Sequence, residues 1–150
     1  MQDGYVPGAT VASRAATIAA DFAAIDLVRS SNMKAVLFNL GANDSYALPA
    51  EATWKANLAT ILDAMNAQWP AAKVYVMRPW TRAHPAECNT MATWTNAVLV
   101  ARAAWASVGP DERVYLENGD DGVTYTYDGV HPTAAGYVLT AAQWKTALGY

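Results

Sequence analysis

The sequence predicts an α/β fold in which a short parallel sheet lies between two layers of helices. Two observations support this prediction. Segments with apolar residues at helical spacing alternate along the chain with short apolar runs that are typical of buried strands. Polar, Gly-containing loops follow the first and the last of these runs, and the carboxyl ends of parallel strands are where open α/β sheets hold their ligands.

Composition limits the classes of protein to consider. The chain has 150 residues, of which 53% are hydrophobic and 15% charged, so we expect one folded domain over residues 1–150. A net charge of −3 without a cluster of Lys or Arg argues against a nucleic-acid partner. No apolar stretch is long enough to span a bilayer. With one cysteine and two histidines, the chain has no internal disulfide, and a structural zinc site is not expected.

The first half of the chain predicts two helices and two strands. Apolar spacing indicates a helix over Ser13–Arg29, with Ser13 as its N-cap. The run Lys34–Leu40 is typical of a strand that is buried on both faces. A second helix is predicted over Glu51–Trp69 and a second strand over Lys73–Met77. This order gives the first two strands of the parallel sheet.

The second half continues the alternation. A loop is expected over 78–89, followed by a helix over Thr90–Ser107 that ends at Val108-Gly-Pro110. The third strand is predicted at Arg113–Leu116, and a polar loop over Gly119–His131 follows it. Pro132 then begins a final helix.

The first segment with chemical potential is Gly41-Ala-Asn43-Asp-Ser45, directly after the first predicted strand. A glycine there lets the backbone turn sharply and approach a ligand. The side-chain amide of Asn43 is a neutral donor suited to an oxyanion. The alternative is an ordinary turn, because Gly, Asn and Asp all favour turns.

The second segment is Asp128-Gly-Val-His131-Pro132, on the loop before the last helix. A carboxylate three residues before a histidine can accept the imidazole N–H and fix the tautomer, which leaves the other ring nitrogen to act as a base. The alternative is a helix-start turn in which Asp128 caps backbone N–H groups and His131 has no catalytic role.

Together and in this order, the two segments resemble blocks of the SGNH hydrolase (GDSL-like esterase) superfamily: Gly-x-Asn-Asp after a strand, and Asp-x-x-His-Pro before the last helix. The resemblance implies a flavodoxin-like SGNH fold that hydrolyses esters without a cofactor or a metal. His131 would be the general base and Asp128 its orienting partner. Asn43 and Gly41, with Gly8 in Tyr5-Val-Pro-Gly8-Ala-Thr10, would form the oxyanion hole.

The chain departs from the family at the nucleophile. No Gly-Asp-Ser, the block that carries the family's serine, occurs in the sequence, and only seven residues precede Gly8. We therefore expect an N-terminally truncated form of the fold. Ser45 follows a strand end and is the candidate for a substitute nucleophile; its alternative role is that of a turn serine.

The missing block also bears on partners. In the family the nucleophile strand is central, so its absence would leave the apolar strand Lys34–Leu40 with an open edge. We expect a second copy of the chain, or a separate N-terminal fragment, to cover that edge.

The leading functional hypothesis is hydrolysis of short-chain carboxylic esters or acetylated sugars, with a small ester as the ligand. Trp80, just after the second strand, and Tyr127, beside Asp128, are candidates for the substrate pocket. His84 is interpreted as a solvated loop histidine. The rival hypothesis, from another class, is a catalytically silent domain that acts as a folded or ligand-binding module.

Overall fold

The computed structural model describes residues 8–23 and 32–150, and it confirms the α/β fold class. Within these residues three parallel strands form a sheet in the order β1-β2-β3. The strands are β1 (Ala35–Phe38), β2 (Lys73–Arg78) and β3 (Ala106–Asp111). The helical elements are α1 (Val11–Ala23), the 3-10 helix η1 (Asn43–Ala47), α3 (Glu51–Gln68), α4 (Pro85–Val100), the short α5 (Val114–Glu117) and α6 (Ala134–Leu148).

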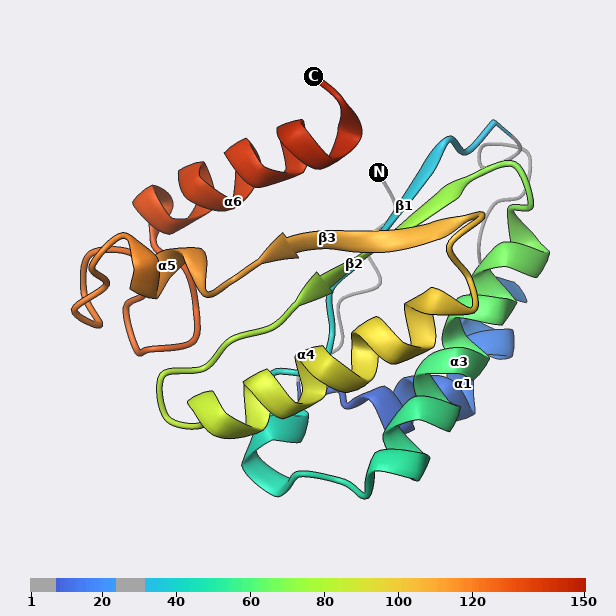
Figure 1. Ribbon diagram of the computed structural model, residues 1–150, viewed down its shortest axis with the longest axis horizontal. Helices are drawn as coiled ribbons and strands as arrows, with labels where there is room; N and C mark the ends of the chain where they lie inside the picture. The colour runs from blue at the N-terminus through green and yellow to red at the C-terminus, as the bar shows by residue number, and fades with distance from the viewer. Residues whose placement is uncertain (1–7, 24–31) are drawn as a thin grey trace.

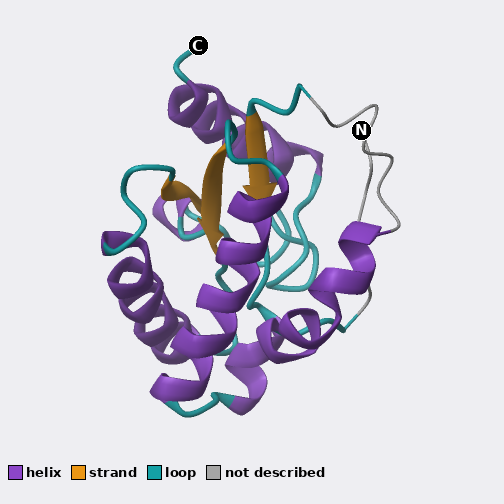
Figure 2. Cartoon of the chain, turned by 90° about the vertical axis from the view of Figure 1, so that its right-hand side faces the viewer, coloured by secondary structure: helices purple, strands orange, loops and turns teal. Residues whose placement is uncertain are grey.

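The helices lie on both faces of the sheet. Figure 1 shows α6 on one face and α1, α3 and α4 on the other, and the turned view in Figure 2 agrees. Strand β2 shows why both faces are covered, since Val74 and Val76 are buried in the core on the side of α3 and α4 while Tyr75 between them contacts Trp144 of α6 edge-to-face. The sheet is therefore the middle layer of three.

The core lies mainly between the sheet and the layer of α1, α3 and α4. Helix α3 buries one stripe at helical spacing, and α4 does the same with its own apolar face. The cluster of buried side chains consists of Val11, Ile18, Phe38, Trp54, Leu58, Ile61, Leu62, Met65, Val74, Val76, Trp80, Cys88, Met91, Val98, Leu99 and Ala106. The loops at the strand ends project from this packed layer.

The third strand is not where the sequence analysis placed it. Residues predicted as a strand, Arg113–Leu116, lie at and within the short helix α5, and the strand is Ala106–Asp111. Pro110 was interpreted as part of a helix stop, but it lies inside β3. A proline is tolerated there because β3 pairs only with β2 among the described residues, and because the register between the two strands is irregular between Val76 and Arg78.

Two helices also begin earlier than predicted. Helix α4 starts at Pro85 instead of Thr90, with the proline in the first turn, where no N–H is needed. Helix α1 starts at Val11, and Thr10 takes the capping role that was expected of Ser13. The N–H of Ser13 donates to Thr10 Oγ1 (3.2 Å), and the N–H of Thr10 donates to Ser13 Oγ (2.9 Å). The part of the predicted helix beyond Ala23 lies outside the described residues.

Strand β1 has one strand neighbour, β2, so it lies at an edge of the sheet that the described residues form. Its side chain Leu37 is about half exposed. None of the helices within residues 8–23 and 32–150 combines the length and apolar character needed to cross a bilayer.

Candidate active site

Three segments meet beyond the carboxyl ends of the strands, and side chains and backbone join them. Ser45 of η1 lies 3.3 Å, Oγ to Oγ1, from Thr81 in the loop after β2. Tyr46 of η1 contacts the ring of His84 in the same loop, with ring centroids 4.4 Å apart. The N–H of Arg82 donates to the carbonyl of Gly129 (2.9 Å). The two segments singled out in the sequence therefore belong to one connected region.

Asp128 and His131 form the hydrogen-bonded pair that the sequence predicts. Oδ2 of Asp128 lies 2.7 Å from Nδ1 of His131, while Oδ1 accepts the backbone N–H groups of His131 (2.8 Å) and Val130 (3.0 Å). Gly129, at φ +82°, allows the tight turn that folds the carboxylate back on the imidazole. Asp128 thus makes the contacts expected under both interpretations of this motif, because it accepts backbone N–H groups of the turn and also holds the histidine ring.

The surroundings of Asp128 favour its ionised form. Hydrogen bonds from the backbone and ring of His131, and from the backbone of Val130, lower the pKa of Asp128 below its ordinary value. A carboxylate that stays ionised can orient the ring and stabilise an imidazolium. Because Nδ1 faces Asp128, Nε2 is the nitrogen that can exchange a proton with a substrate, and the His131 side chain is 60% exposed.

Tyr127 packs against this histidine. The two rings are nearly parallel, at 14°, with centroids 5.5 Å apart, and the N–H of Tyr127 donates to the carbonyl of His131 (3.1 Å). Tyr127 was predicted to shape the substrate pocket; its ring is largely exposed beside the imidazole. The stack restricts the rotation of the His131 ring that Asp128 already orients.

A second carboxylate, which the sequence analysis did not assign, supports the same loop. Asp120 accepts the N–H groups of Tyr125 and Thr126 (both 3.1 Å) and the hydroxyl of Thr126 (2.8 Å). Burial alone would raise the pKa of Asp120, but these hydrogen bonds outweigh it and lower the pKa. Asp120 therefore fixes the segment Tyr125–Thr126, which leads into Asp128.

The predicted oxyanion residues lie together on the other side of the region. The side-chain amide of Asn43 donates to the carbonyl of Ala9 (3.0 Å), and Oδ2 of Asp44 accepts the N–H of Val11 (3.0 Å). These bonds place Asn43 beside the segment that begins with Gly8, which is exposed and has φ +69°. Burial raises the pKa of Asp44, against the effect of its backbone hydrogen bonds.

Gly41 has a strict steric reason to be glycine. Its φ is +121°, and a Cβ there would lie 2.7 Å from Cη2 of Trp54 in the core. The turn that presents Asn43 is thus packed directly on α3.

Ser45 does not face the same surface. Its side chain is 2% exposed, and its hydroxyl donates to the carbonyl of Ala42 (2.7 Å) beside Thr81. The structure brings Ser45 against the inner side of η1, where these contacts favour the turn-serine interpretation over that of a substitute nucleophile.

Trp80, predicted for the pocket, is buried in the core, and its backbone N–H donates to Oε2 of Glu112 (3.0 Å). Glu112 is a residue that sequence reasoning missed. It directly follows β3, and the position would have attracted notice had the strand been assigned to 106–111. His84 is half-buried against Tyr46 instead of fully solvated.

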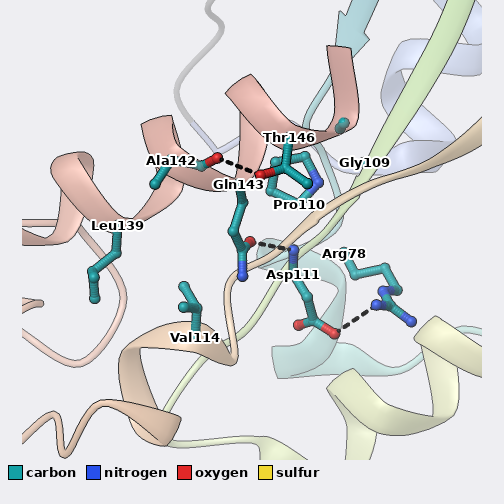
Figure 3. A pocket seen from close by; sticks show the side chains of 10 residues that line it. Arg78, Gly109, Pro110, Asp111, Val114, Leu139, Ala142, Gln143 and Thr146 are labelled. Atoms are coloured by element: carbon teal, nitrogen blue, oxygen red, sulfur yellow. Dashed lines mark hydrogen bonds and ion pairs between the residues drawn. The ribbon is translucent and has the colours of Figure 1, made fainter. Parts of the chain in front are cut away.

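Two hollows lie near the strand ends. The larger, about 480 Å³, is between β3, α5 and α6; Figure 3 shows Arg78 paired with Asp111, and Gln143 bound to the Asp111 N–H, on its wall. None of the predicted catalytic residues lines it. The smaller, about 370 Å³, is lined by Asp128 and Gly129 together with Arg82, Ala83, Asp121 and Gly122. No cluster of three metal-binding side chains occurs among the described residues.

Comparison with known proteins shows the family and the fold. A family model described as the GDSL-like Lipase/Acylhydrolase family matches residues 4–139. A carbohydrate esterase family 3 structure from Talaromyces cellulolyticus shares 23% identity at a TM-score of 0.71, over 98% of this chain and 72% of that one. An alpha/beta hydrolase, LAE5, from the metagenome of Lake Arreo, Spain, shares 17% identity at a TM-score of 0.73, over 95% and 69%.

A variant of an acetyl xylan esterase from Geobacillus stearothermophilus shares 19% identity at a TM-score of 0.66, over 95% of this chain and 69% of that one. No curated protein matches the sequence significantly. These likenesses show the fold, and the family model covers most of the chain, including both the Asn43 and the His131 segments. The chain belongs to the GDSL-like lipase/acylhydrolase family and is a carboxyl-ester hydrolase.

Proposed function

We propose that the chain hydrolyses short-chain acyl esters, acetylated sugars among them, at the site formed by Asp128, His131 and Asn43. The observation that carries the proposal is the 2.7 Å contact between Asp128 Oδ2 and His131 Nδ1, on a turn that leaves the imidazole exposed. An ionised carboxylate behind an accessible imidazole is the arrangement that general-base catalysis of acyl transfer requires.

In this mechanism Nε2 of His131 removes a proton from the attacking hydroxyl as its oxygen forms a bond to the acyl carbon. The Asp128 carboxylate stabilises the imidazolium that results. The side-chain amide of Asn43 and the N–H of Gly8 stabilise the negative charge on the acyl oxygen. When the tetrahedral intermediate collapses, the bond to the alcohol oxygen breaks and the imidazolium gives its proton to the departing alcohol. Attack by water leaves the free carboxylic acid at this point, whereas attack by a side chain leaves an acyl-enzyme that a water molecule then hydrolyses by the same steps.

The attacking hydroxyl belongs to water, or to a side chain outside the described residues, and not to Ser45. Ser45 is buried and its hydroxyl is bound to the carbonyl of Ala42, whereas the exposed ring of His131 is open to solvent. Direct attack by water lacks a covalent intermediate and is the slower route.

Sugar esters are the favoured substrates. Tyr46 and Tyr127 are both more than half exposed, from the two segments that flank the site, and flat aromatic rings of this kind pack well on sugar rings. The solved structures of similar fold include a carbohydrate esterase and an acetyl xylan esterase.

The test is hydrolysis of p-nitrophenyl acetate and of a peracetylated xylooligosaccharide by the chain of verified mass. His131→Ala should abolish turnover and Ser45→Ala should retain it. Labelling with a fluorophosphonate, followed by peptide mass spectrometry, separates the two sources of the hydroxyl, because a side-chain nucleophile is labelled and water is not. If the wild type and His131→Ala both match the buffer blank, the silent-module hypothesis replaces this one.

A further inference from the structure

The centre of the strand-end region holds a buried carboxyl group that the mechanism above does not use. Glu112 is only 7% exposed and directly follows β3. Its backbone N–H donates to the carbonyl of Arg78, the last residue of β2 (3.1 Å). Charged side chains are rarely buried to this degree unless specific partners hold them.

The partners of this carboxyl come from the other two strand ends. Oε2 of Glu112 accepts the backbone N–H of Trp80, two residues after β2, at 3.0 Å. The side-chain amide of Asn39, the first residue after β1, also hydrogen-bonds to the carboxyl group. One side chain therefore joins the carboxyl ends of all three strands.

Each of the two partners begins a segment of the catalytic site. Asn39 leads through Gly41 to Asn43, the proposed oxyanion donor. Trp80 leads to Arg82, whose N–H holds the carbonyl of Gly129 in the turn of the catalytic pair. The Glu112 carboxyl thus lies at the point from which the oxyanion loop and the support of the histidine turn diverge.

We propose that Glu112 is a positioning residue, which sets the spacing between Asn43 and His131 through its hydrogen bonds to Asn39 and Trp80. This proposal rests on the proposed function for its catalytic consequence. The ionised carboxylate accepts both N–H groups strongly, whereas the protonated acid must use one oxygen as a donor, so the spacing is held best in the ionised form.

The groups around Glu112 place that ionisation in the neutral range. Burial, the largest effect, raises the pKa of Glu112 to about 7, hydrogen bonds from Trp80 and Asn39 oppose it, and the nearby charges of Asp111 and His131 act in opposite directions. Arg78 and Arg113 both pair with Asp111, and the thiol of Cys88 and the hydroxyl of Tyr115 also face the charge of Glu112.

The first test needs no activity. In ¹⁵N-labelled protein, we expect Glu112→Gln to shift the side-chain amide resonances of Asn39 and Asn43 and the backbone amide of His131. The matched control, Glu117→Gln, removes the same charge from an exposed position on α5 and should leave all three in place. If Glu112→Gln is folded and the Asn43 and His131 signals do not move, Glu112 does not position them.

The second test uses hydrolysis. The ratio of wild-type to Glu112→Gln kcat should rise from about 1 near pH 6 to roughly threefold to tenfold above about pH 8, which is the effect of weakening one charge-assisted hydrogen bond. Ionisations that the two proteins share cancel in this ratio. A ratio that is flat with pH would contradict the proposed effect of ionisation.

Asn39→Ala provides a second variant should Glu112→Gln fail to fold. It removes one of the two hydrogen bonds from an exposed residue and should displace Asn43 more than His131. Unchanged Asn43 signals in folded Asn39→Ala would overturn the proposal. An inactive wild type would reject the proposed function, while the resonance shifts would still decide whether Glu112 positions the two segments.

Discussion

The ring of Tyr127 lies nearly parallel to the ring of His131, at 14° and with centroids 5.5 Å apart. The backbone N–H of Tyr127 also donates to the carbonyl of His131. Asp128 fixes one atom of the imidazole, but a single hydrogen bond leaves the ring free to tilt. The aromatic contact restricts that tilt, and contacts of this kind contribute about 0.5–1.5 kcal/mol.

Tyr127→Ala should therefore lower kcat by roughly twofold to tenfold, the range that corresponds to that energy. Tyr127→Phe keeps the ring and should retain most of the activity. Steady-state hydrolysis of p-nitrophenyl acetate measures both. Equal losses in the two variants would assign the effect to the phenol hydroxyl and not to the stack.

Asp128→Asn should reduce kcat by about 100-fold or more, because an amide can present the wrong group to Nδ1 and cannot stabilise an imidazolium. The sign of the pH effect on stability follows from the lowered pKa of Asp128. Its contribution is present above the ordinary pKa of an aspartate and is lost as the pH falls through the folded-state value. Circular dichroism along an acid titration should thus show a smaller loss of stability in Asp128→Asn than in the wild type.

Ser45→Ala should lower the free energy of unfolding by about 1 kcal/mol, since it removes a buried hydroxyl that donates to the Ala42 carbonyl. Hydrolysis should persist, in contrast to the loss expected in His131→Ala. Urea denaturation gives the first quantity and the ester assay the second. A stable but inactive Ser45→Ala would restore the serine as a nucleophile.

Glu112 should make the folded protein less stable as the pH rises. Its pKa is raised from 4.5 to about 7, so the folded state keeps a proton that the unfolded chain has lost. Its contribution is complete below about pH 4.5 and is lost as the pH rises through about 7, by at most about 3 kcal/mol. Urea denaturation between these pH values should show the decline in the wild type and not in Glu112→Gln. A parallel decline in the two proteins would place the ionisation elsewhere.

The edge of β1 should recruit a partner, either a second copy of the chain or a separate N-terminal fragment, and the second copy is the case that the chain alone can test. Light scattering should then give about twice the 16.0 kDa of the single chain. Leu37→Lys places a charge on the half-exposed position of this strand and should restore the single-chain mass. A wild type that is monomeric at high concentration would contradict the expectation.

The sequence predicted the parallel sheet, both helices α3 and α6, and the Asp128–His131 pair, because those features depend on local patterns. Helix α3 has a regular apolar stripe, and the histidine turn needs only residues three positions apart. The third strand could not be predicted in the same way. Its Gly109-Pro110 is a local stop signal, and only the pairing with β2 makes it part of a strand.

Because the third strand was placed at the wrong residues, the sequence analysis also did not identify Glu112. With the strand predicted at Arg113–Leu116, Glu112 lay just before a strand, whereas a glutamate directly after a strand lies among the carboxyl ends of the other strands. The burial of Ser45 was equally beyond local patterns, since it depends on Thr81, 36 positions away. Sequence patterns thus predicted the segments of the candidate site, and tertiary contacts determine which of their side chains are buried.

The bond between Arg82 and Gly129 is made by backbone atoms alone. Any residue except proline can supply the N–H at position 82. This contact therefore does not depend on the identity of the side chain at position 82, whereas the Arg82 guanidinium makes a separate hydrogen bond to the carbonyl of Asp120 (3.2 Å). Since Arg82 also lines the hollow beside Asp128, a substitution of its side chain would change the wall of that hollow while the backbone bond to Gly129 remains.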